Sequence, residues 1–198
     1  MNYERCELCP RRCGVNRTAG ERGFCGCPDT ALVAKVMLHK WEEPVLAGEG
    51  GSGAVFFGGC TLGCKYCQNR AISGAPVGEP VNAGQLRQIM ENLIARGAEN
   101  IDLVTPTQFL PTILPALEPK LPVPVVYNCG GYERAEPSGH WLGKSTFICR
   151  TSNTETTFWQ NGFPARVTMW NRHRRPSGRW CGRLARRGGT ERSLPPAW

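Results

Sequence analysis

The chain has 198 residues, enough for one domain with a modest hydrophobic core, and no apolar run in it is long enough to cross a membrane. Its net charge of +8 suggests a nucleic-acid partner, but residues 1–136 carry 13 basic and 14 acidic side chains, whereas residues 137–198 carry 11 and 2. The positive excess therefore lies in the last third, and nucleic acid is not an expected partner of the rest. Eleven cysteines, with a charged first stretch unlike a signal peptide, indicate a cytoplasmic protein whose cysteines bind metal or take part in catalysis.

The first thirty residues are rich in cysteine, arginine, glycine and proline, and they contain too few apolar residues to fold without help. Their five cysteines are enough to supply the four thiolates of a zinc site or of an auxiliary iron–sulfur cluster. We predict a second metal site here, formed by Cys6, Cys9 and Cys13 with Cys25 or Cys27, and we take Cys25 as the first choice. The alternative is a remnant that has lost part of its metal ligands.

Predicted strands and helices alternate after this segment. Strands are expected at residues 31–38, 54–59, 100–106 and 123–128, and helices at residues 86–97 and 107–119. The order strand, helix, strand, helix, strand from residue 54 onward predicts an α/β fold with right-handed βαβ units on a parallel sheet. In such folds the carboxyl ends of the strands carry the chemistry, and here they read "GGC", "VTPT" and "YNCGG".

Three cysteines follow the strand expected at residues 54–59 with the spacing C-x3-C-x2-C: Cys60, Cys64 and Cys67. Each iron of a 4Fe–4S cube binds one thiolate, so three cysteines on one loop leave the fourth iron open for another ligand. A zinc site or a chance spacing is the alternative. The position of the loop, directly after an apolar strand and between glycines, favours the cluster.

At these residues the sequence resembles the radical S-adenosylmethionine superfamily, whose signature is this spacing with an aromatic residue beside the last cysteine, here Tyr66. The segments "CELCPRRCGVNRTAGERGFCG", "WEEPVLAGEGGSGAVFFGGCTLGCKYCQN", "NIDLVTPTQFLPTIL" and "VVYNCGGYE" resemble, more narrowly, uncharacterised radical proteins that are similar to pyruvate formate-lyase-activating enzyme. The resemblance runs almost continuously from residue 6 to about residue 136.

The resemblance implies a fragment of a partial (β/α)6 barrel, with a cysteine-rich extension at residues 1–50 and the first three βα units at residues 51–136. It implies an enzyme that binds a 4Fe–4S cluster and S-adenosylmethionine and generates a 5′-deoxyadenosyl radical. That radical would abstract hydrogen from an unknown substrate, which could be a protein. A reductant such as flavodoxin or ferredoxin is the expected partner, and no membrane partner is expected.

The same resemblance implies roles for individual residues. The cluster ligands would be Cys60, Cys64 and Cys67, and Tyr66 would pack near the adenine. Further contacts with the cofactor or the substrate are expected at the strand ends, from Thr105 and Asn128.

Residues 137–198 show no helical or strand period, although they hold ten arginines and five of the six tryptophans. Where the family continues with a strand resembling "VDIYLPDFKY", this chain reads "STFICRTSNT". The codons of residues 144–154, regrouped in a shifted frame, permit the family's letters. We therefore expect a reading-frame slip near Glu136 and a truncated, poorly active chain.

Two further expectations follow for this tail. Residues 137–198 should be disordered, because nothing has shaped their apolar pattern, and the strand expected at residues 123–128 should keep an open edge with no covering helix. The competing hypothesis is a metal-stabilised nucleic-acid-binding module that uses the cysteine cluster and the basic tail.

Overall fold

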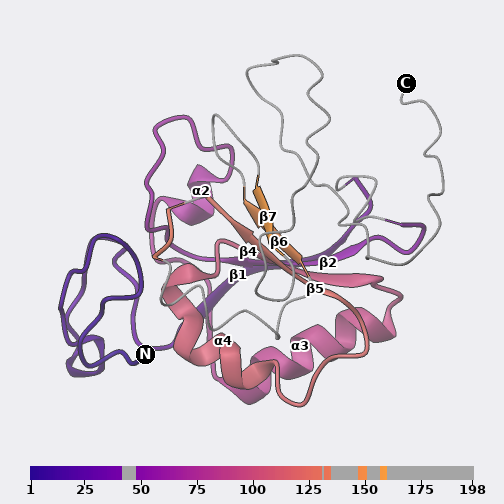
Figure 1. The fold of residues 1–198 in the computed structure, drawn as a ribbon, viewed down its shortest axis with the longest axis horizontal. Helices are drawn as coiled ribbons and strands as arrows, with labels where there is room; N and C mark the ends of the chain where they lie inside the picture. Colours follow the sequence, from indigo (N-terminus) through magenta and orange to yellow (C-terminus); the bar gives the residue numbers. More distant parts are fainter. Residues whose placement is uncertain (42–47, 131, 135–146, 151–156, 160–198) are drawn as a thin grey trace.

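A computed structural model of the chain describes residues 1–41, 48–130, 132–134, 147–150 and 157–159 (Figure 1). Within these residues seven strands form one sheet in the order β3-β1-β2-β4-β5-β6-β7. The strands are β1 (Ala31–His39), β2 (Ser52–Phe57), β3 (Glu79–Val81), β4 (Asn100–Val104), β5 (Val125–Cys129), β6 (Phe147–Arg150) and β7 (Thr157–Trp159). The helical segments are η1 (Arg17–Ala19), α2 (Arg70–Ser73), α3 (Ala83–Ala95), η2 (Thr107–Phe109) and α4 (Leu110–Ala116).

The centre of the sheet is parallel. β2 pairs with β4 and β4 pairs with β5, both in the parallel direction, which confirms the parallel pairing predicted for these three strands. Every residue of β4 and β5 is buried, as expected for strands that are covered on both faces. The carboxyl ends of β2, β4 and β5 therefore meet at one edge of the sheet. Closure into a partial barrel stays a prediction.

The amino-terminal side of the sheet is antiparallel, which the sequence did not predict. β1 pairs with β2, and the three-residue strand β3 pairs with the first residues of β1. Gly78 precedes β3 at φ 128°, and a Cβ atom there would lie 2.7 Å from the backbone of Val33. Only glycine fits this approach, so it fixes where the chain returns to the sheet after the cysteine loop.

Helices α3 and α4 lie on the same side of the sheet (Figure 1). α3 begins at a capping box, in which the Asn82 side chain accepts from the Gln85 amide and the Gln85 side chain accepts from the Asn82 amide. Its buried face consists of Leu86, Met90 and Leu93, in agreement with the predicted helical period. None of the helices in the described part of the chain is long and apolar enough to span a membrane.

The expectation of an open edge on β5 is wrong. β6 pairs with β5 in the parallel direction, with Phe147 opposite Val126 and Arg150 opposite Cys129, and β7 then pairs with β6 in the antiparallel direction. The pairing uses main-chain groups that every residue carries, and phenylalanine and isoleucine favour extended backbone. Residues 144–149 ("KSTFIC") and their shifted-frame counterpart "VDIYL" both contain residues of this kind, so a strand beside β5 is compatible with either frame.

Most of the tail lies outside the described residues. The expectation of disorder is wrong for Phe147–Arg150 and Thr157–Trp159, which form β6 and β7. Its remainder, at residues 137–146, 151–156 and 160–198, and the basic nucleic-acid module lie outside the described residues. Those expectations, and the reading-frame slip itself, stay predictions.

Replacement of Leu86 by alanine tests whether α3 supports the sheet. The side chain is fully buried, so Leu86→Ala is expected to lower the free energy of unfolding by about 2–5 kcal/mol, through lost burial and a residual cavity. The control is Gln88→Ala, an exposed position on the same helix, which is expected to change stability by less than about 0.5 kcal/mol. Equal effects of the two substitutions in anaerobic urea unfolding would contradict this packing.

Candidate metal centre

The three cysteines of the C-x3-C-x2-C motif lie on the loop that joins β2 to α2, at the carboxyl end of β2. Cys60, Cys64 and Cys67 are all partly exposed. The Leu62 amide donates to Cys60 Sγ over 3.4 Å, and Cys67 Sγ lies 3.3 Å from the hydroxyl oxygen of Ser73. Backbone and hydroxyl groups of this kind commonly hydrogen-bond to metal-bound thiolates. The loop thus presents three accessible sulfur atoms within eight residues of chain.

Glycines give the loop its path. Gly59 and Gly63 have φ of +69° and +72°, which is the left-handed region that glycine adopts readily. A Cβ atom on Gly59 would lie only 2.4 Å from Cys27 Sγ. The turn that leads into Cys60 therefore needs glycine for its conformation and also for the space beside the amino-terminal extension.

A buried glutamine holds the beginning of the loop. The Gln108 side chain donates from Nε2 to the carbonyl oxygens of Gly58 and Gly59, over 3.1 and 3.0 Å, and is 2% exposed. Sequence analysis did not select this residue. The available signal was a polar side chain in an apolar stretch, directly after a strand end that was expected to carry chemistry.

The two strand-end candidates for cofactor contact lie next to each other. The Thr105 amide donates to the Asn128 carbonyl oxygen over 2.8 Å, and Thr105 has φ of +55°, which is rare for a threonine. Thr105 is partly exposed. Asn128 is buried, and its side-chain amide donates from Nδ2 to Asp102 Oδ2 over 3.2 Å. Thr105 is thus the more accessible of the two.

The cysteine loop lies over the end of β5. A Cβ atom on Gly130, directly after β5, would come within 3.0 Å of the Leu62 side chain. Tyr66, beside Cys67, leaves 72% of its surface exposed. The structure therefore brings the loop and the end of β5 together, and the large exposed ring of Tyr66 can be covered by a bound molecule.

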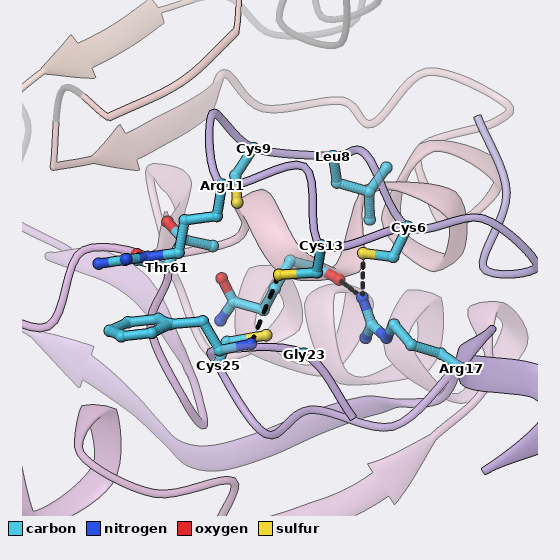
Figure 2. A pocket seen from close by; sticks show the side chains of 11 residues that line it. Cys6, Leu8, Cys9, Arg11, Cys13, Arg17, Gly23, Cys25 and Thr61 are labelled. Atoms are coloured by element: carbon cyan, nitrogen blue, oxygen red, sulfur yellow. Dashed lines mark hydrogen bonds between the residues drawn. The ribbon is translucent and has the colours of Figure 1, made fainter. Parts of the chain in front are cut away.

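Four of the five amino-terminal cysteines line a single pocket: Cys6, Cys9, Cys13 and Cys25 (Figure 2). The pocket also borders the cysteine loop, because Thr61 and Gln108 contribute to its wall. Cys27 does not line it. The Cys27 side chain is fully buried and its thiol donates to the Gly58 carbonyl oxygen over 3.6 Å.

Two arginines connect the extension to the rest of the site, and sequence analysis missed both. Arg17 is 1% exposed and donates to the Gln108 carbonyl oxygen over 2.7 Å. Arg11 donates from Nε to the Thr61 carbonyl oxygen over 2.7 Å, and its guanidinium lies 3.2 Å from the centre of the Phe24 ring. Burial of a charged side chain cannot be read from one sequence, so the pattern gave no signal for Arg17.

The environment changes the acidity of several thiols. The side-chain hydrogen bond with Cys27 lowers the pKa of Cys25 to about 6, and the same bond together with burial raises the pKa of Cys27. Burial, followed by the neighbouring Cys60 and Cys67, raises the pKa of Cys64. Thiolates that lie close together repel one another, and a bound metal would relieve that repulsion.

In the described part of the chain no three cysteine, histidine or acidic side chains already converge around a point that could hold a metal ion. Metal binding would therefore require the sulfur atoms of the cysteine loop to turn toward a common centre, and the same holds for the sulfur atoms of Cys6, Cys9, Cys13 and Cys25.

Comparisons with known proteins point to the same segment. Residues 46–107 match the family model described as a 4Fe-4S single cluster domain. The chain is also similar to an uncharacterised protein of Methanocaldococcus jannaschii, with 32% identity over 144 residues. That alignment covers 68% of this chain and 41% of the relative, so the chain spans less than half of the relative's length. No solved structure matches.

The family match includes β2, the whole cysteine loop, α3 and β4, and it supports an iron–sulfur protein that binds a 4Fe–4S cluster. Three thiols on one loop fit such a cluster because each can supply one thiolate. The subgroup similar to pyruvate formate-lyase-activating enzyme stays a prediction.

Substitution of Gln108 tests the support of the loop. Gln108→Leu keeps the volume but removes the donor to Gly59, and a buried acceptor left without its donor costs about 1–3 kcal/mol. We expect the reconstituted protein to release iron to a chelator faster than the unsubstituted chain. The control is Gln88→Leu on the exposed face of α3, which should leave the rate unchanged. The same rate for Gln108→Leu and the unsubstituted chain would remove Gln108 from this role.

Proposed function

We propose that the protein is a radical S-adenosylmethionine protein whose Cys60, Cys64 and Cys67 hold a 4Fe–4S cluster. The observation that supports the proposal most strongly is the placement of three thiols on one glycine-turned loop, within the segment that matches the single-cluster domain. If Cys60, Cys64 and Cys67 supply three thiolates, a bound cluster would have one iron available for the amino and carboxylate groups of S-adenosylmethionine. When bound, the reduced cluster and this cofactor would supply a 5′-deoxyadenosyl radical for hydrogen abstraction.

The residues of the chain would orient and shield that chemistry. Gln108 keeps Gly58 and Gly59 in place, and these residues set the path of the loop into Cys60. Tyr66 offers an exposed ring on the cysteine loop for contact with the adenine. Thr105 offers a partly exposed side chain at the same edge of the sheet. These roles are proposed from the positions of the residues, all of which lie in the described part of the chain.

The substrate and the partners belong to the proposal as well. A role similar to that of an activating enzyme would make the substrate a protein, and a small electron-transfer protein such as flavodoxin or ferredoxin would supply the electron in the cytoplasm. The chain spans 41% of its relative from Methanocaldococcus jannaschii, so substrate and partners are proposed from the resemblance and not from that relative.

Cys64→Ala tests the ligand assignment. Each cysteine of the loop would supply one thiolate, so anaerobic reconstitution of this variant should lose the four-iron signal and most of the acid-labile sulfide. The control is Cys181→Ala in the basic tail, which should bind as much iron as the unsubstituted chain. Full iron and sulfide in the Cys64→Ala variant would refute the assignment.

Cleavage of the cofactor tests the open iron and the tail together. With dithionite and S-adenosylmethionine, a chain in which the reading frame is restored after Glu136 should release 5′-deoxyadenosine. The present chain should release little, because the later strands of the expected barrel would be missing. Equal turnover by the two chains would show that residues 137–198 are a working part of the protein.

A further inference from the structure

We infer that Cys6, Cys9, Cys13 and Cys25 form a second, closed metal site with four thiolate ligands, in which Cys25, and not Cys27, is the fourth ligand. The site would bind a thiophilic centre, either Zn²⁺ or an auxiliary iron–sulfur cluster, and its role would be structural because no ligand position is left open. The inference goes beyond the proposed function and does not depend on S-adenosylmethionine.

The backbone brings three of the thiols onto one small loop. The Cys6 amide donates to the Val15 carbonyl oxygen over 2.9 Å, and the Gly14 amide donates to the Cys6 carbonyl oxygen over 3.0 Å. These two bonds close residues 6–15 into a loop, and the turn from Cys9 to Arg12 is closed by a third bond of 3.1 Å. Cys25 approaches the same pocket from the following segment (Figure 2).

The choice between Cys25 and Cys27 follows from their surroundings. Cys25 is partly exposed and lines the pocket with the other three thiols. Cys27 does not line the pocket: its thiol hydrogen-bonds to the Cys25 side chain and lies 3.4 Å from the Cys25 carbonyl oxygen and 3.6 Å from the Gly58 carbonyl oxygen. A Cβ atom at Gly59 would meet its sulfur at 2.4 Å, so Cys27 is fixed between the extension and the cluster loop. Cys27 thus acts as a packed hydrogen-bond donor.

The pocket already contains donors for bound thiolates. The Phe24 amide donates to Cys13 Sγ over 3.5 Å, and Arg17 donates to Cys6 Sγ over 3.8 Å. Gly23 leaves room for one of these thiols, because a Cβ atom at this position would lie 2.9 Å from Cys13 Sγ and would displace it. Groups that orient the ligands in this way are a regular feature of metal sites.

The two arginines that line the pocket favour a metal centre with four thiolates, which is negatively charged, over a metal ion with neutral ligands, which is positively charged. Four thiolates around Zn²⁺, or around a cluster core of the same charge, carry a net charge of about −2. Two cationic side chains, Arg11 and Arg17, line the pocket and can offset that charge. They would repel a metal ion held by neutral ligands.

The second site would also hold the first one in place. Arg11 follows Cys9 by two residues and donates to the carbonyl oxygens of Thr61 and Leu62, which lie on the cluster loop between Cys60 and Cys64. A metal bound by the cysteines of residues 6–13 would therefore also hold Arg11 in position to donate to the loop that carries Cys60, Cys64 and Cys67. The amino-terminal extension has too few apolar residues to form a core of its own, so a bound metal would supply its stability. Through Arg11, that stability would also support the loop that carries the first cluster.

The decisive experiment measures metal in a full-length chain that cannot form the first cluster. In a background with Cys60, Cys64 and Cys67 replaced by serine, anaerobically purified protein should still contain one metal centre, as zinc or as iron with sulfide. Metal analysis of this background separates the two sites, so a failure of the proposed first cluster would leave this result unaffected. Absence of bound metal after exposure to Zn²⁺ and to iron with sulfide would overturn the second site.

Two neighbouring substitutions in that background identify the fourth ligand. Cys25→Ser should lower the metal affinity by more than about tenfold. Loss of a residue that only hydrogen-bonds to a ligand already costs about 10–100-fold, and loss of a ligand itself should cost at least as much. Cys27→Ser is the matched control, since a hydroxyl can still donate to the Gly58 carbonyl oxygen, and it should bind metal as the background does. Loss of metal in Cys27→Ser with retention in Cys25→Ser would overturn the ligand set.

Thiol labelling of the unsubstituted chain tests whether the second site binds metal, and it does not depend on the folding of the Cys25→Ser variant. Cys13 is exposed, so iodoacetamide should reach it readily unless metal covers the sulfur. We expect Cys13 to resist labelling in the metal-loaded protein and to be labelled after chelation. Equal labelling of Cys13 in both states would overturn the inference.

Discussion

The positions of the three loop thiols depend on two buried carbonyl groups, those of Gly58 and Gly59, which accept hydrogen bonds from the side chain of Gln108. The chain leaves the parallel sheet at this point and must turn through a left-handed glycine before it reaches Cys60. Because Gln108 follows β4, the same bonds tie the cluster loop to the neighbouring strand. A buried acceptor without a donor is costly, so the loop path and the amide are maintained together.

The amino-terminal extension is coupled to the same glutamine from the other side. Arg17 donates to the Gln108 carbonyl oxygen and also contacts Cys6 Sγ, while Arg11 donates to carbonyl groups on the cluster loop. Buried ionic groups are stable only when their donors are satisfied. The extension and the cysteine loop are thus coupled, because the order of both segments depends on shared hydrogen bonds.

The sequence alone predicted those parts of the fold that depend on local patterns. The helical period from Leu86 onward, the parallel pairing of β2, β4 and β5, and the grouping of Cys6, Cys9, Cys13 and Cys25 in one region all appear in the structure. Each follows from residue spacing, which is visible in a single chain.

Features that depend on the tertiary fold could not be predicted in this way. The strand β3 is only three residues long and forms because Gly78 lets the chain approach β1. The buried roles of Arg17 and Gln108 arise from contacts with residues far along the chain. The residue types at 147–150 allow a strand, but its partner β5 could not be assigned from the sequence, because main-chain hydrogen bonds can form with any extended segment.

The central claim is that the cysteine loop holds a 4Fe–4S cluster with one iron open to S-adenosylmethionine. Electron–nuclear double resonance on the dithionite-reduced protein, with S-adenosylmethionine labelled by ¹⁵N in the amino group and ¹⁷O in the carboxylate, tests this directly. The account predicts hyperfine coupling of both labels to the cluster spin, since both groups would bind the open iron. A fully reduced cluster that shows neither coupling in the presence of excess labelled cofactor would contradict it.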